Sequence, residues 1–104
     1  MQQITRLMRE AFLEGKPFKR DNTEVVVNEF GVSIYLFGNK IAFRSDYKGA
    51  TGYDFMVITT CGWPTRTTKD RLNALPNVHI HQLKSMWYLN GNKWDGSGIT
   101  INLI

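Results

Sequence analysis

Residues 62–73 concentrate hydroxyl and basic side chains at the predicted start of a helix. Within this segment Thr67 is followed three residues later by Asp70, a spacing that matches a capping box. The first turn of a helix leaves backbone N–H groups without intrahelical partners, and the helix dipole favours negative charge there. The segment therefore predicts an anion site that suits the phosphate of a nucleic acid. We expect the phosphate contacts to come from Arg66, Thr67, Thr68, Lys69 and Arg71.

A structural interpretation of the same segment stays open. Thr67 would cap the helix, Trp63 would fill the core, and the basic residues would form a solvated face. Asp70 would neutralise part of the positive charge that attracts an anion. The segment supports either interpretation at this point.

A second group of residues suited to binding surrounds a turn signal at Asn90 and Gly91. It combines aromatic and basic side chains: Lys84, Trp87, Tyr88, Lys93 and Trp94. Bases of single-stranded nucleic acid stack on exposed aromatic rings, each contributing roughly 1–3 kcal/mol, while cations hold the backbone. We therefore expect Trp87 and Trp94 to stack on bases. The alternatives are a protein-binding hot spot and ordinary packing of the rings in the core.

The remaining reactive residues do not form a catalytic or metal site. His79 and His81 project from the same face of a predicted strand, but no further ligands accompany them. Cys61 lies between a strand and a helix, where a thiol can be activated, yet it fits a small buried hydrophobic residue better. No nucleophile-elbow, phosphate-loop or dinucleotide-binding pattern is present. We expect no catalytic residue, no metal and no small-molecule cofactor.

The N-terminal half contains one helix and three strands that position these groups. Apolar residues with a helical period of about 3.6 predict an amphipathic helix over residues 3–14. Alternating β-branched and aromatic residues then predict strands over residues 24–30, 32–37 and 40–44. Gly38 and Asn39 predict a tight hairpin turn between the last two strands.

The C-terminal half predicts four more strands and one short helix. A loop over residues 45–52 precedes a strand at 55–60, which is apolar on both faces and should be central. A two-turn helix begins at Thr67 and ends before Pro76. The last strands, a β-meander, span residues 78–83, 86–89 and 99–103.

This order of elements predicts an α+β fold, a single domain over residues 1–104. It would consist of an N-terminal amphipathic helix and a largely antiparallel sheet, with one short helix inserted and a C-terminal β-meander. The content of 42% hydrophobic and 21% charged residues is that of a globular chain and excludes a disordered one.

Charge, cysteine content and hydropathy bear on partners and compartment. A net charge of +4 favours encounters with acidic surfaces. The single cysteine cannot form an intramolecular disulfide, which fits a reducing compartment, so we expect a cytoplasmic protein. No stretch has the roughly 20 apolar residues of a membrane span, and we expect no membrane association.

Two patterns resemble small proteins encoded by tailed bacteriophages. They are Gly-Asn-Lys-Ile-Ala at residues 38–42 and Gly-Trp-Pro-Thr-Arg-Thr-Thr-Lys-Asp-Arg-Leu-Asn at residues 62–73, followed by a Trp87 segment that ends near Gly96. The resemblance covers residues 32–96 and implies no particular activity. It does imply a phage context, in which the protein acts in the cytoplasm of the infected host cell.

Two functional hypotheses follow, both without catalysis. The first is an accessory protein that binds nucleic acid, whose binding weakens steeply with salt because phosphate contacts release counterions. The alternative is a protein-binding module that inhibits or modulates a host enzyme or defence system, with weaker salt dependence. Basic residues grouped beside an exposed tryptophan would favour the first, and an exposed uncharged aromatic patch would favour the second.

A structural subunit of a particle is a third class, because an exposed edge at residues 99–103 can pair with another strand. The sequence does not fix the oligomeric state or the identity of the partner.

Overall fold

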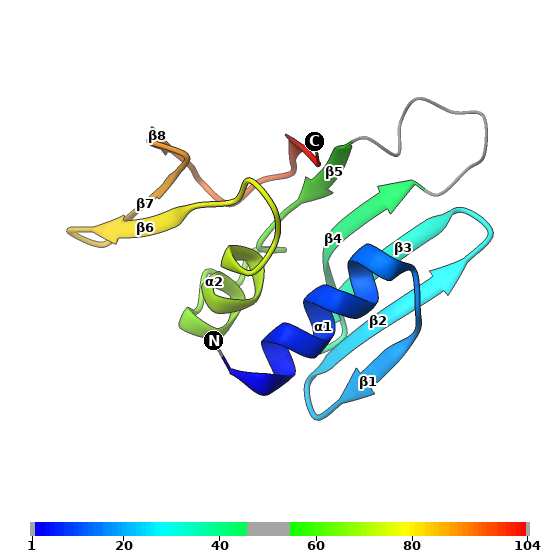
Figure 1. Cartoon of the computed structure of the whole chain (residues 1–104). Helices are drawn as coiled ribbons and strands as arrows, with labels where there is room; N and C mark the ends of the chain where they lie inside the picture. Colours follow the sequence, from blue (N-terminus) through cyan, green and yellow to red (C-terminus); the bar gives the residue numbers. More distant parts are fainter. Residues whose placement is uncertain (1, 46–54, 104) are drawn as a thin grey trace.

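A computed structural model describes residues 2–45 and 55–103 and places two helices against antiparallel sheets (Figure 1). This arrangement confirms the α+β class. The predicted loop at residues 45–52 lies outside the described residues except for Ser45, the last residue of a strand.

The first helix, α1, spans Gln3–Glu14, as its apolar period predicts. Its buried stripe contains Met8, Ala11 and Phe12, which pack on the inner face of the main sheet. The helix ends at Gly15, whose φ of +73° is readily adopted only by glycine. Within the described residues, neither helix has the length and apolar character needed to cross a membrane.

The main sheet has six antiparallel strands in the order β1-β2-β3-β4-β5-β9. Their bounds are β1 Phe18–Arg20, β2 Thr23–Asn28, β3 Gly31–Leu36, β4 Asn39–Ser45, β5 Phe55–Ile58 and β9 Ile99–Asn102. The short strand β1 was not predicted, because three residues are too few to show an alternating pattern. Alternate residues such as Val25, Val32 and Ile34 form the core beneath α1.

The hairpin between β3 and β4 turns one residue earlier than predicted. Leu36 pairs with Asn39, so the turn residues are Phe37 and Gly38, not Gly38 and Asn39. Both have positive φ, +51° and +78°, as a two-residue turn that matches strand twist requires. The shift leaves Phe37 at the tip of the hairpin, outside the core.

The apolar composition of strand β5 predicted burial on both faces, but only one face is buried. Met56 and Ile58 are buried against the core, but Phe55 and Val57 are about two-fifths exposed on the opposite face. β5 does lie inside the sheet, between β4 and β9. The exposed apolar residues are a property of the outer sheet face, which the strand's sequence alone does not reveal.

The second helix, α2, spans Arg66–Asn73 and leads into a separate three-stranded sheet. This sheet contains β6 Ile80–Leu83, β7 Met86–Leu89 and β8 Asn92–Lys93. The meander predicted from residues 78–83, 86–89 and 99–103 is wrong in its last strand. The third strand of this sheet is β8, which was not predicted, and β9 pairs with β5 in the main sheet instead. Gly96 enables this crossing, because it packs so closely on Thr60 that a Cβ atom would clash with the threonine hydroxyl.

The start of α2 also differs from the prediction. The N-cap residue is Thr65, not Thr67: its Oγ1 accepts a hydrogen bond from the Thr68 N–H at 3.2 Å. Thr65 has the extended backbone of an N-cap, and Pro64 disfavours helical backbone at Trp63, the residue before it. Thr67 is a half-buried residue inside the first turn.

Candidate binding surface

A hydrogen-bonded loop at residues 59–65 holds the Trp63 side chain outward. Trp63 N–H donates to the Thr60 carbonyl at 2.9 Å, and the Trp63 carbonyl accepts from the Thr68 hydroxyl at 2.9 Å. These bonds fix the backbone on both sides of Trp63, whose side chain is 61% exposed. The structural interpretation of this segment expected Trp63 to fill the core. Its side chain instead points outward.

Cys61 in the same loop is exposed rather than buried. Its φ is +54°, and its thiol donates to the Lys40 carbonyl at 2.6 Å. The interpretation of this cysteine as a buried hydrophobic residue was wrong, because the chain has already turned out of β5 when it reaches residue 61.

Phe37 is the second large exposed aromatic residue on this side of the molecule. It is 68% exposed, and its N–H donates to the Asn22 carbonyl at 2.8 Å. A positive φ is rare for a bulky side chain and costs free energy, so such a residue is a candidate for function. An Asn-Gly pair would form the same turn with less strain.

An apolar hollow of about 350 Å³ lies between these two aromatic side chains. Phe37 and Trp63 line it together with Leu36, Asn39, Ile41, Thr60, Thr65 and Thr68. None of these lining residues carries a charge. A concave apolar surface with a few hydroxyl and amide groups suits an apolar or aromatic side chain of a partner.

Two of the predicted phosphate-binding residues are buried. Arg71 is only 4% exposed, and it donates hydrogen bonds to Thr5, Thr23 and Gln2 at 2.8, 3.1 and 3.4 Å. Burial lowers the pKa of the Arg71 guanidinium from its ordinary value, an effect that the nearby Asp70 partly opposes. Thr68 is 2% exposed. Arg71 therefore ties α2 to α1 and β2, and the expected solvated face does not include it.

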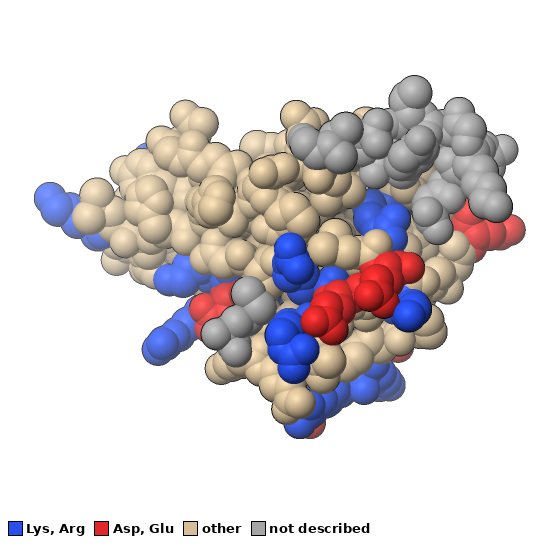
Figure 2. All heavy atoms as spheres, in the orientation of Figure 1, with Lys and Arg blue, Asp and Glu red and all other residues tan. Residues whose placement is uncertain are grey.

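The other basic side chains on the face in Figure 2 do not form one continuous patch. Arg66 is exposed and Lys69 half-buried on α2. On the face in Figure 2, Lys and Arg side chains lie in separate groups with Asp and Glu side chains among them. On α1, Arg6 pairs with Glu10 at 3.3 Å, which reduces the positive charge there.

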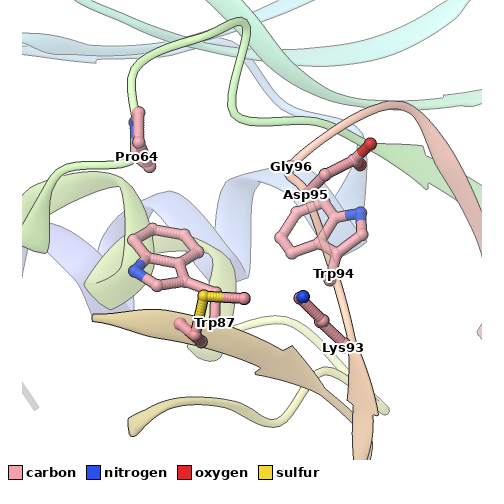
Figure 3. A pocket seen from close by; sticks show the side chains of 7 residues that line it. Pro64, Trp87, Lys93, Trp94, Asp95 and Gly96 are labelled. Carbon is pink, nitrogen blue, oxygen red and sulfur yellow. The ribbon is translucent and has the colours of Figure 1, made fainter. Parts of the chain in front are cut away.

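Trp87 and Trp94 lie together, but mainly inside the molecule. They are 9% and 7% exposed, and their rings contact each other at 6.3 Å between centroids. They form the wall of an open hollow of about 540 Å³, lined also by Pro64, Lys93 and Asp95 (Figure 3). Little ring surface remains for base stacking, since each indole packs mostly against the protein.

The two histidines that share a predicted strand face are both exposed. The His81 ring stacks on Tyr88 at 5.2 Å between centroids, which gives it a packing role across β6 and β7. Among the described residues, no group of three or more histidine, cysteine or acidic side chains is placed to hold a metal ion.

Sequence comparison places the chain in a phage context. The model of a family described as Kyanoviridae Gp96 protein matches residues 1–100. The chain belongs to this family of bacteriophage proteins. The match confirms the predicted phage family and extends beyond residues 32–96, on which the resemblance rested. That residues 62–73 are a signature of this family stays a prediction. No curated protein and no solved structure matched the chain.

The residues that sequence reasoning missed are Phe37 and Trp63. For Phe37 the available signal was the glycine that follows it, because a residue before glycine in a tight hairpin often lies in the turn itself. For Trp63 the signal was its place between Gly62 and Pro64, both typical of loops. An aromatic residue in a loop has no periodic apolar neighbours to indicate a core position.

Proposed function

We propose that this phage protein is a non-enzymatic module that binds another protein through the surface around Phe37 and Trp63. In the infected cell it would inhibit or modulate a host enzyme or defence system. The observation that carries the proposal is the uncharged hollow between two aromatic side chains that are 68% and 61% exposed.

Interface energetics support a protein partner. Tryptophan is enriched among the few residues that supply most of the binding energy, and hot spots lie in apolar, desolvated centres. The fully buried core of an interface is depleted of charged residues, as this hollow is. A strained Phe37 is understandable if its ring contributes more to binding than its backbone conformation costs in stability.

The nucleic-acid hypothesis stays a prediction and differs in its consequences. The net charge of +4 and the exposed Arg66 favour it, but Thr68 and Arg71 are buried and Trp87 and Trp94 offer little ring surface. It predicts DNA binding that falls steeply between low and moderate salt and depends on Arg66 and Lys69.

Quantitative capture from extracts of infected host cells tests the proposal. We expect the wild-type chain and an Arg66→Ala, Lys69→Ala double variant to recover the same protein partner, and Trp63→Ser to lose it by at least about tenfold. To test the nucleic-acid hypothesis, the wild-type chain and the double variant are also titrated with single-stranded and duplex DNA at two salt concentrations. Salt-sensitive DNA binding lost in the double variant, or partner recovery unchanged in Trp63→Ser, would overturn the proposal.

A further inference from the structure

The two edge strands of the six-stranded sheet differ in how they are protected. β1 carries Lys19 and Arg20, and charged side chains on an edge discourage pairing with another strand. β9, with the sequence Ile-Thr-Ile-Asn, carries no charge. The β9 edge therefore lacks the charged side chains that discourage strand addition.

The backbone direction of β9 follows from the pairing of β5. Thr59 N–H, just past the end of β5, donates to the Ile41 carbonyl at 2.9 Å. The odd-numbered residues of β5 therefore direct their N–H and C=O groups toward β4. The even-numbered residues of β5 are left to bond with β9, and the register places them opposite Ile99 and Ile101. Thr100 and Asn102 therefore direct their N–H and C=O groups away from β5.

A side-chain contact agrees with this direction. The Asn102 carbonyl accepts a hydrogen bond from Asn77 Nδ2 at 2.8 Å, and Asn77 belongs to the segment between α2 and β6. Thr100 N–H and C=O have no hydrogen-bond partner in the part of the chain that the structure describes. One donor and one acceptor are thus available at the centre of the edge.

A groove runs along this free edge. It consists of two hollows of about 210 and 400 Å³ that share Asn90, Thr100 and Ile101 and so form one depression. β9 is one wall, and the turn between β7 and β8 is the other.

The geometry points to strand addition: an extended segment of another polypeptide pairs with β9 through the Thr100 N–H and C=O. Lys93 is the only charged residue among those that line the groove, so the segment carries an acidic side chain on that side. Apolar residues at alternate positions would contact Ile99, which lines the groove and is 40% exposed. This site is separate from the Phe37 and Trp63 surface and does not depend on the function proposed for it.

Selection from a display library of random linear peptides, each about ten residues long, tests the inference. We expect enriched peptides with alternating apolar residues and an acid, which slow amide hydrogen exchange at Thr100. Affinity should fall at least about tenfold in Thr100→Pro, which removes the N–H, and remain unchanged in Thr100→Val and in Trp63→Ser.

A modified peptide keeps the test valid if Thr100→Pro does not fold. N-methylation of the peptide amides that face β9 should abolish binding to the wild-type chain, whereas methylation of the intervening amides should not. Three results would each overturn the inference: no enriched peptide, binding without protection of Thr100, or a self-associating chain that Thr100→Pro converts to monomer.

Discussion

At the residue scale, Arg71 shows how a basic side chain predicted to bind phosphate is used within the fold. Its guanidinium is held by the Thr5 and Thr23 hydroxyls and by Gln2. No acidic side chain of the described residues forms an ion pair with it. These neutral partners accept its hydrogen bonds but supply no negative charge. Burial therefore disfavours the charged guanidinium and lowers the pKa of Arg71.

Replacement of Arg71 by methionine should destabilise the protein by about 1–3 kcal/mol, because buried hydroxyls of α1 and β2 lose their partner. Arg66→Met is the matched control, since Arg66 is exposed on the same helix and its loss should change stability by no more than about 0.5 kcal/mol. Urea denaturation of both variants measures the difference. Equal stabilities would contradict a structural role for Arg71.

The Asp95 carboxylate offers a prediction on pH. Hydrogen bonds from Ser97, including its N–H at 3.0 Å, hold the pKa of Asp95 below its ordinary value. A depressed carboxylate pKa stabilises the fold above the unfolded-state pKa, and this stabilisation is lost as pH falls through the folded-state pKa. NMR titration should give Asp95 a midpoint below 3.8, and Ser97→Pro should raise it. A midpoint at or above that value in the wild type would contradict the hydrogen-bonded turn.

At the element scale, the N-cap of α2 is Thr65, whereas the sequence pattern alone assigns the cap to Thr67. Thr65→Ala should cost about 1 kcal/mol because the Thr68 N–H loses its acceptor. Thr67→Ala, two residues later, should cost less, since Thr67 has no capping hydrogen bond. Thermal unfolding measures the stability of the two variants. A larger loss of stability in Thr67→Ala would support the capping box predicted from Thr67 and Asp70.

The elements themselves were largely predictable, but several turns and caps between them were not. The stripe of Met8, Ala11 and Phe12 and the alternation in β2 to β4 are periodic, so many residues support each assignment. The turn at Phe37 and the cap at Thr65 each depend on a single residue, and a neighbouring residue of similar propensity was equally plausible. The separation of β9 from the meander depends on close packing of Gly96 against Thr60, which no local pattern encodes.

At the scale of the whole molecule, both sheets contribute to one hydrophobic core. Ile80, Trp87, Leu89 and Trp94 of the C-terminal part belong to the same buried cluster as the residues beneath α1. We expect one cooperative unfolding transition. In a Trp63→Phe background, fluorescence then reports Trp87 and Trp94, and its midpoint should coincide with that of circular dichroism. Two separate midpoints would show that the smaller sheet unfolds independently.

The candidate surface emerged from the tertiary arrangement more than from its motifs. The 62–73 segment did mark the right region, since Trp63, Thr65 and Thr68 line the apolar hollow. Phe37 comes to the same hollow from a distant hairpin, and burial removes Arg71 from the surface. Burial and long-range contact depend on the whole fold, so sequence alone could not separate these residues.

The most direct test of the Phe37 and Trp63 surface compares asparagine substitutions at two exposed phenylalanines, Phe37 and Phe30, which are 68% and 67% exposed at opposite ends of β3. Phe37→Asn creates an Asn-Gly turn and should stabilise the fold by about 1 kcal/mol while it removes binding to the captured protein partner. Phe30→Asn should retain binding. A Phe37→Asn variant that binds the partner as well as Phe30→Asn does would contradict the account.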